Sequence, residues 1–230
     1  VASASNLRTT IVSSLDNYAR NIEINKFGGR FKYSKLNTLI DRVDNGITSN
    51  ITKVIIRRDL KALLNQFAQY ELCFGNRFNI NPAGYNIKST GFTVSGSNET
   101  AFLTDVPNKD ASGNLDGSMK GTLSVVFKNQ RDKQQVLIKD AGIVDYKKGE
   151  IILNTINITS TAAENNIIEV QAFPESNDVV GLKDLYLSFD VSKSTINMFK
   201  DVIASGEDVS GVVFTSCLLY TSPSPRDATL

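Results

Sequence analysis

The segment from Ile47 to Phe78 constrains the fold more than any other part of the chain. Its sequence, ITSNITKVIIRRDLKALLNQFAQYELCFGNRF, contains two runs of alternating side chains. The first run places Val54, Ile56 and Arg58 on one face, because successive residues of a strand point to opposite faces. The second run, Gln69–Phe74, alternates in the same way. The segment therefore predicts a half-buried antiparallel pair of strands joined by a short connection.

Charged residues inside the first of these strands mark a candidate interface. Charges within an apolar strand often lie at a sheet edge or in an interface, and the planar guanidinium of Arg can bind a carboxylate through two hydrogen bonds. The two alternatives are an interface role and simple exposure on an open sheet face. In either case, reversing both arginine charges is expected to leave the fold intact. The candidate interface residues are Arg57, Arg58, Asp59, Tyr70 and Phe74.

Two amphipathic helices are predicted before this segment. The first has an apolar stripe at helical spacing, formed by Ile11, Leu15, Tyr18 and Ile22. The second is expected at Lys35–Val43, with Ser34 as its N-cap. Asp44-Asn45-Gly46 then supplies the turn residues that end it.

The chain after residue 80 reads as mostly β. Strands are predicted at Tyr85–Val94, Thr122–Phe127, Asn166–Phe173 and Leu185–Val191. Asn98–Met119 is rich in Asn, Asp, Gly and Ser and predicts a long surface loop. Gly142–Leu153 reads as a tight hairpin, in which Lys147-Lys148-Gly149 suits a type I turn with a G1 bulge. Gly149 is therefore expected to be a structural turn residue.

The last residues of the chain break the pattern that precedes them. Cys217–Leu230 reads CLLYTSPSPRDATL, and one back-translation of it resembles a transposon adapter used in sequencing libraries. We interpret it as a disordered artefact of metagenomic assembly, with a real disordered tail as the alternative. The expected fold class is α+β, with N-terminal amphipathic helices followed by a β-rich body of mainly antiparallel hairpins. The expected division is 1–80 (helices and strand pair), 81–216 (β-rich body) and 217–230 (artefact).

Composition restricts the chemistry available to the chain. Histidine is absent, which removes the commonest general base and the commonest metal ligand. With 25 basic and 24 acidic residues, the net charge of +1 does not favour nucleic-acid binding. No apolar run approaches the roughly 20 residues that span a membrane. We expect no enzyme activity, no catalytic residue, no metal and no cofactor.

One loop has the alternating oxygen ligands of a calcium site. Asp110–Gly117 reads DASGNLDG and offers Asp110, Ser112, Asn114 and Asp116. Leu115 stands where such loops need a Gly, and Gly121 stands where they need a Glu. A solvated loop is the preferred interpretation.

Several segments together resemble one protein family. ITSNITKVIIRRDL and QYELCFGNRF resemble the C-terminal region of the baseplate wedge subunit of T-even-like contractile-tailed bacteriophages. FGGRFKYSKLNTLIDRVDNGI (Phe27–Ile47) fits the same family. GIVDYKKGEIIL (Gly142–Leu153) and DLYLSFDVSKSTINMFKDVIASG (Asp184–Gly206) resemble its hairpin and its closing segment. The resemblance spans most of Leu7–Gly211, with a looser part at Ser95–Gly121.

The resemblance implies a structural component of the phage tail baseplate wedge. Such a protein would form a homo-oligomer, expected to be a dimer within a ring, and would bind other wedge proteins around the tail hub. It would reside in the virion, and in the host cytoplasm during assembly, with no nucleic-acid or membrane partner. A carbohydrate- or receptor-binding tail module is the alternative, although the chain has no Trp to stack on sugar rings. A hydrolase is a third and weaker alternative.

Overall fold

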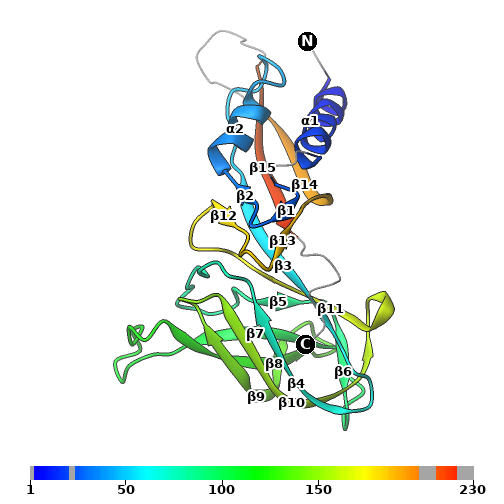
Figure 1. Cartoon of the computed structure of the whole chain (residues 1–230), viewed down its shortest axis with the longest axis vertical. Coiled ribbons are helices and arrows are strands. Elements are labelled where there is room, and N and C mark those ends of the chain that lie inside the picture. The colour runs from blue at the N-terminus through cyan, green and yellow to red at the C-terminus, as the bar shows by residue number, and fades with distance from the viewer. Residues whose placement is uncertain (1–2, 21–23, 202–210, 222–230) are drawn as a thin grey trace. The chain divides into compact units, whose positions relative to one another are not determined.

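The computed structural model describes residues 3–20, 24–201 and 211–221 (Figure 1). Side chains are described for residues 3–20 and 24–199. The described part is rich in antiparallel strands and contains two α-helices, the first of them near the N-terminus. The expected class is therefore supported, with strands predominating over helices.

The chain divides into two compact units. Among the described residues, unit 1 combines those up to Ile55 with those from Asn177 onward, and unit 2 is Ile56–Ser176. The main segment of unit 2 is thus inserted, along the chain, between the two segments of unit 1. This division differs from the expected one at residue 80, because strands on both sides of that residue pair with each other inside unit 2.

Helix α1 (Ala4–Ala19) begins unit 1. The hydroxyl of Ser3 caps it by accepting a hydrogen bond from the backbone N–H of Asn6, at 3.3 Å. Its buried residues lie at helical spacing, at Leu7, Ile11, Leu15 and Tyr18. The predicted stripe is confirmed for its described members, while Ile22 lies outside the described residues.

Helix α2 (Tyr33–Asp41) starts two residues earlier than predicted. The predicted N-cap, Ser34, lies inside the helix, and the actual N-cap, Lys32, makes no side-chain capping bond. A carboxylate far along the chain replaces that bond: Asp178 accepts from the backbone N–H of Tyr33 at 2.8 Å. A negative charge is favourable at this end of a helix.

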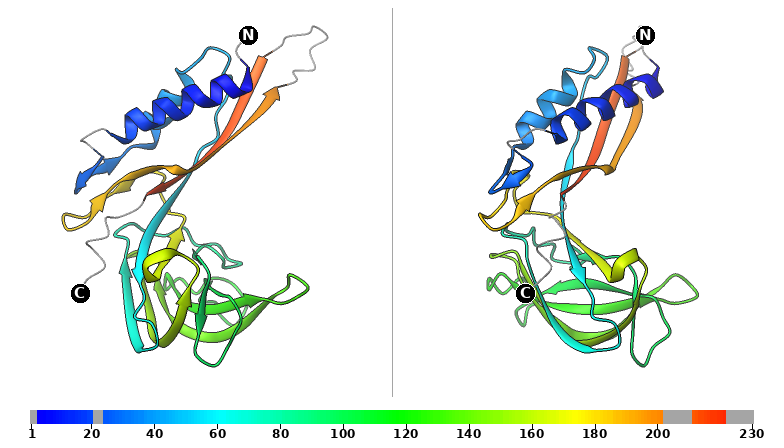
Figure 2. Two further views of the ribbon diagram at one scale, coloured as in Figure 1. Left: turned by 90° about the vertical axis from the view of Figure 1, so that its right-hand side faces the viewer. Right: turned by 45° about the vertical axis from the view of Figure 1, so that its right-hand side comes forward.

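Unit 1 also contains three antiparallel strand pairs. These are β1 (Lys26–Phe27) with β13 (Tyr186–Leu187), β2 (Arg30–Phe31) with β12 (Val179–Val180), and β14 (Phe189–Asp201) with β15 (Gly211–Thr221). Figure 2 shows α1 lying along β14 and β15. Rings from three elements meet there: Tyr18 packs edge-on against Phe31 and Phe189, with centroid distances of 6.4 and 5.7 Å.

Strand β15 contains part of the segment that the sequence sets apart as an artefact. Its pairing with β14 continues through Cys217 to Thr221. Residues 222–230 lie outside the described residues. Strand β3 (Lys53–Lys61) begins in unit 1 and ends in unit 2.

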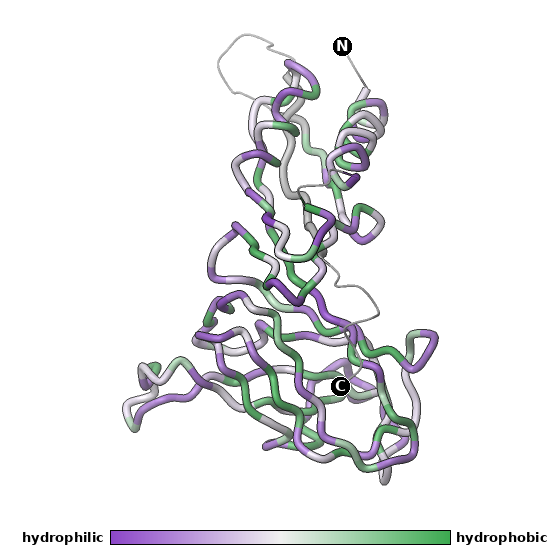
Figure 3. Tube along the Cα trace, viewed as in Figure 1, coloured by the Kyte–Doolittle hydropathy of each residue, from purple (hydrophilic) through white to green (hydrophobic). Residues whose placement is uncertain are grey.

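Unit 2 is built around a closed ring of five strands. They are β6 (Phe92–Val94), β7 (Ala101–Pro107), β8 (Lys120–Lys128), β9 (Gln134–Asp145) and β10 (Glu150–Thr161). The ring closes because β10 pairs with both β6 and β9. Figure 3 shows hydrophobic segments along these strands, and their buried side chains include Phe92, Leu103, Leu123, Val125, Val144 and Leu153.

Three further strands and a short helical turn complete unit 2. They are β4 (Phe67–Cys73), β5 (Lys88–Ser89), β11 (Ile167–Ala172) and the 3-10 turn Glu164–Asn166. Both strands predicted within the opening segment exist, but the predicted pairing between them is wrong. β3 pairs with β11, whereas β4 pairs with β10. Side-chain alternation indicates a strand but does not identify its neighbour.

The loop predicted over Asn98–Met119 is only partly a loop. Its first part is strand β7, which pairs with β8 from Ala101 to Pro107. The sequence does not predict this strand because Asp105, a charged residue type, occupies one of its inward-facing positions. The carboxylate of Asp105 is fully buried. The predicted hairpin is present: β9 and β10 pair with Asp145 opposite Glu150.

Candidate functional site

The five candidate interface residues lie in or beside two strands of unit 2. Arg57, Arg58 and Asp59 belong to β3, Tyr70 belongs to β4, and Phe74 follows β4 directly. The structure brings three of them to one cleft, which is lined by Arg58, Asp59, Leu60, Lys61, Gln69, Tyr70, Glu71, Leu72, Cys73 and Ile152. Arg57 and Phe74 do not line it.

Both arginines are buried. The exposed fraction is 8% for Arg57 and 9% for Arg58. Simple exposure on an open sheet face is therefore wrong. β3 is covered on both faces, since its residues from Val54 to Arg58 are all buried. A buried Arg needs charged or polar neighbours, because an unpaired charge is costly to remove from water.

Arg57 has its counter-charges within the chain. Its Nε lies 3.4 Å from Oδ1 of Asp59, and its Nη1 lies 3.2 Å from Oε1 of Glu169. The antiparallel register of β3 and β11 places Glu169 directly opposite Asp59. Arg57 therefore links two neighbouring strands, and we interpret its role as structural.

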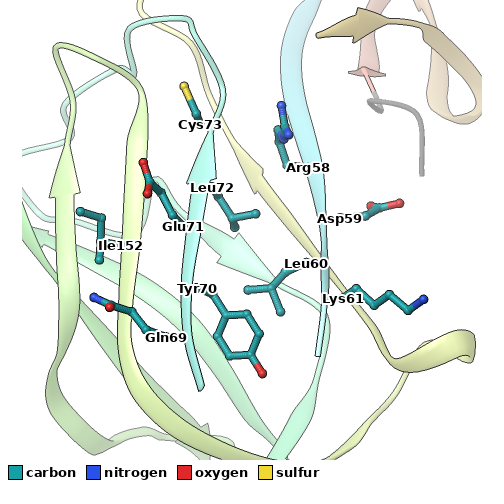
Figure 4. Close-up of a pocket in the computed structure, with 10 residues that line it drawn as sticks. All are labelled: Arg58, Asp59, Leu60, Lys61, Gln69, Tyr70, Glu71, Leu72, Cys73 and Ile152. Carbon is teal, nitrogen blue, oxygen red and sulfur yellow. The ribbon is translucent and has the colours of Figure 1, made fainter. Parts of the chain in front are cut away.

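Arg58 lies on the opposite face of β3, together with Leu60. Figure 4 shows this face turned toward β4, whose Tyr70 and Leu72 point toward β3. The cleft between the two strands has a volume of about 530 Å³, within the range of ligand-binding pockets, roughly 300–1,000 Å³. Its interior is apolar around Leu60 and Leu72, with one cation at Arg58.

Tyr70 and Phe74 differ in what they contact. The hydroxyl of Tyr70 accepts a hydrogen bond from the backbone N–H of Leu63 at 3.0 Å, which ties β4 to the connection from β3. Phe74 is 5% exposed and packs edge-on against Phe78, with ring centroids 5.1 Å apart. In this structure Phe74 is thus a core residue of unit 2.

Gly149 occupies a backbone position that other residues adopt at a cost. Its φ is +72°, in the left-handed region. Its N–H donates to the carbonyl of Asp145 at 2.9 Å, and its carbonyl accepts from the N–H of Phe74 at 2.8 Å. A Cβ at this position would lie 2.0 Å from the carbonyl oxygen of Asn76. The turn therefore also fixes the chain segment that follows β4.

The Asp110–Gly117 loop uses its carboxylates internally. Oδ1 of Asp110 accepts from the N–H groups of Ser112 and Asn114 at 2.9 and 3.0 Å. Ser118 donates to Asp116 through both its hydroxyl and its N–H, which lowers the pKa of Asp116 below its ordinary value. Among the described residues, no group of three His, Cys, Asp or Glu side chains is placed to hold a metal ion. In the same part of the chain, no helix combines the length and apolarity needed to cross a membrane.

Unit 2 contains a buried polar pair that was not predicted from the sequence. The hydroxyl of Tyr146 donates to Oδ2 of Asp105 at 2.7 Å, and Oδ1 of Asp105 accepts from the N–H of Ile87 at 2.7 Å. Both side chains are fully buried. Burial, followed by the adjacent carboxylate, raises the pKa of Tyr146 well above its ordinary value. The pair joins β7 to the β9–β10 turn; its only sequence signal is an Asp at an inward position of an alternating strand.

One comparison with known proteins identifies part of the chain. Residues 1–59 match the family described as baseplate structural protein gp6, C-terminal domain III. The match covers α1, α2 and β3 as far as Asp59. It confirms the resemblance to the baseplate wedge subunit of T-even-like phages. No curated protein matches the chain.

Proposed function

We propose that this chain is a baseplate structural protein, and specifically a wedge component that binds copies of itself and other wedge proteins. Its first 59 residues match the gp6 C-terminal domain III family. The family match carries this proposal. It supports a structural role in the virion tail baseplate, and such a role requires no catalytic residue. The ring around the tail hub, with a dimer as its unit, and assembly in the host cytoplasm are the finer parts of the proposal.

The contact with a partner is proposed to involve Arg58 and not Arg57. Arg57 does not line the cleft and lies on the other face of β3, near Asp59 and Glu169 at 3.4 and 3.2 Å. Arg58 borders the cleft, where a partner group can approach it. Arg is among the residues that contribute most to protein–protein binding.

Co-expression with the other baseplate proteins of the same phage tests this function. We expect an affinity tag on the full chain to recover at least one of them in stoichiometric amount. Arg58→Ala should reduce that recovery about tenfold, the effect expected at a central interface residue. Arg131→Ala, at an exposed position of the same unit, is the control and should leave recovery unchanged.

Circular dichroism of each purified variant separates binding from folding. A folded Arg58→Ala variant with normal recovery would remove Arg58 from the contact. A folded wild-type chain that recovers no baseplate protein and remains monomeric would contradict the proposed function as a whole.

A further inference from the structure

Strand β4 has a partner on only one side in the part of the chain that the structure describes. It pairs with β10, antiparallel, from Cys73 opposite Glu150 to Phe67 opposite Asn157. It is the terminal strand in the order of its sheet. A terminal strand presents a row of backbone N–H and C=O groups to which another strand can bind.

The register shows which backbone groups face away from β10. The N–H of Phe74 donates to the carbonyl of Gly149, so Phe74 and Gly149 form a hydrogen-bonded pair. Such pairs alternate with non-hydrogen-bonded pairs along an antiparallel ladder. Leu72 and Tyr70 therefore also bond toward β10. The N–H and C=O groups of Gln69, Glu71 and Cys73 point toward the open edge.

This open edge borders the cleft described above. Figure 4 shows β10, with Ile152, on one side of β4 and β3 on the other. The side chains that reach into the cleft are Arg58 and Leu60 from β3 and Tyr70 and Leu72 from β4. An extended segment lying in the cleft would thus meet backbone hydrogen-bonding groups, an aliphatic surface and one guanidinium group.

We propose that this cleft binds a single extended segment of another baseplate protein, which adds a strand to the open edge of β4. The segment presents an aliphatic side chain to Leu60 and Leu72 and a carboxylate to Arg58. This mode of recognition obtains affinity from main-chain hydrogen bonds and specificity from alternate side chains. The identity of the partner class rests on the proposed function, whereas the site itself rests on the strand geometry.

The shape of the cleft favours one strand over a second copy of the same edge. In a second copy, the open edge of β4 likewise lies across the cleft from that copy's own β3. If two copies brought their β4 edges together, the β3 strand of each copy would collide with the other copy. Two folded edges therefore cannot approach each other as closely as a single extended segment can approach one edge. A free segment has no such neighbours.

Charge complementarity at Arg58 favours a carboxylate on the segment. The carboxylates of Asp59 and Glu71 also line the cleft, but each belongs to the other face of its strand and points away from the space between β3 and β4 in Figure 4. Arg58 has five N–H donors in a fixed fork, so it can bind a carboxylate in addition to contacts within the chain. The other cation that lines the cleft, Lys61, belongs to the Arg57 face of β3 and points away in Figure 4. The segment is therefore expected to place its carboxylate near the Arg58 end of the cleft.

Hydrogen–deuterium exchange at single-residue resolution tests this binding mode in the full chain. Amides are compared between the isolated chain and its complex with co-expressed baseplate proteins. On assembly, we expect exchange at Gln69, Glu71 and Cys73 to slow about tenfold or more, as each amide gains a hydrogen bond. The inward-facing amides of Tyr70 and Leu72 should be protected in both states.

Two substitutions at one position separate the backbone from the side chain. Glu71→Pro removes an outward-facing N–H, which an edge strand tolerates, and should abolish the partner's binding. Glu71→Ala keeps that N–H and should retain binding. Loss of binding in both variants would assign the effect to the carboxylate and overturn strand addition.

The outcomes distinguish this inference from the proposed function. If the chain assembles while the three outward amides remain in fast exchange, strand addition at β4 is wrong and the structural role stands. If the chain associates with no baseplate protein, the proposed function is wrong, and so is the proposed class of partner.

Discussion

At the scale of single residues, the two adjacent arginines of β3 have different surroundings although they are equally buried. Arg57 faces Asp59 and Glu169, whereas Arg58 faces the cleft. The contacts of Arg57 therefore argue against the expectation that reversing both arginine charges leaves the fold intact. Arg57→Glu would place a third carboxylate beside Asp59 and Glu169, which Arg57 now neutralises. The free energy of unfolding would therefore fall.

Arg57→Gln should lower the free energy of unfolding by about 2–4 kcal/mol. Breaking a buried ion pair by removing one partner costs about 3–5 kcal/mol, and the partial exposure of Asp59 and Glu169, 18% and 24%, reduces that figure. Urea denaturation measures the effect. Arg131→Gln, at an exposed position, is the matched control and should change stability by less than about 0.5 kcal/mol. Equal stability of the two variants would show that the Arg57 ion pairs contribute nothing.

Tyr146→Phe should destabilise the protein by about 1–3 kcal/mol, because it leaves the buried Oδ2 of Asp105 without its donor. Tyr70→Phe removes a hydroxyl from a half-buried site and is the control, with a smaller expected cost. Denaturant titration near pH 7 compares the two.

The same pair gives the stability of the protein a dependence on alkaline pH. The pKa of Tyr146 is raised in the folded state above its ordinary value of 10.0. The unfolded state therefore loses this proton first, so the contribution is fully present below about pH 10 and is lost as pH rises above it. Wild-type protein should lose stability more steeply above about pH 10 than Tyr146→Phe. Parallel curves for the two proteins would contradict this assignment.

At the scale of elements, the β9–β10 turn depends on Gly149 in two ways. A side chain there meets a left-handed backbone and a carbonyl oxygen 2.0 Å from its Cβ. Gly113 has a similar φ of +83°, but a Cβ added there would have nothing within 4 Å. Gly113→Ala should therefore cost about 1 kcal/mol or less, and Gly149→Ala clearly more. Comparing the thermal unfolding of both variants isolates the steric contribution at Gly149. An equal loss of stability in the two variants would show that Asn76 moves away from the added Cβ at little cost.

The elements also show how far local pattern determines structure. Periodicity was sufficient for α1, β3 and β4, because each has an apolar stripe or an alternation that its own residues define, and the turn residues ending in Gly149 were sufficient for the β9–β10 hairpin. It was insufficient for the pairing of β3 with β11, since pairing depends on residues about 110 positions apart. The prediction of the α2 N-cap was wrong for the same reason, because Asp178 supplies the capping bond from the other segment of unit 1. Among the residues that line the cleft, Arg58, Asp59 and Tyr70 were interface candidates in the sequence, whereas the open edge of β4 follows only from its pairing.

At the scale of the whole molecule, the bounds of the family match do not coincide with the division into two units. The matched residues, 1–59, contain both helices of unit 1 and end within β3. The strand ring, the Asp105–Tyr146 pair and the open edge of β4 belong to unit 2. Unit 1 could not be delimited from sequence, because its core joins α1 to Phe189 on a segment that returns after the whole of unit 2.

The chain is proposed to function by assembling with baseplate proteins. Sedimentation velocity of the full chain tests it most directly, first alone over a dilution series and then mixed with each co-expressed baseplate protein. We expect a concentration-dependent shift toward a dimer for the chain alone, and a faster-sedimenting boundary containing both proteins in at least one mixture. A folded chain that sediments as a monomer at every concentration, and separately from every baseplate protein, would contradict the claim.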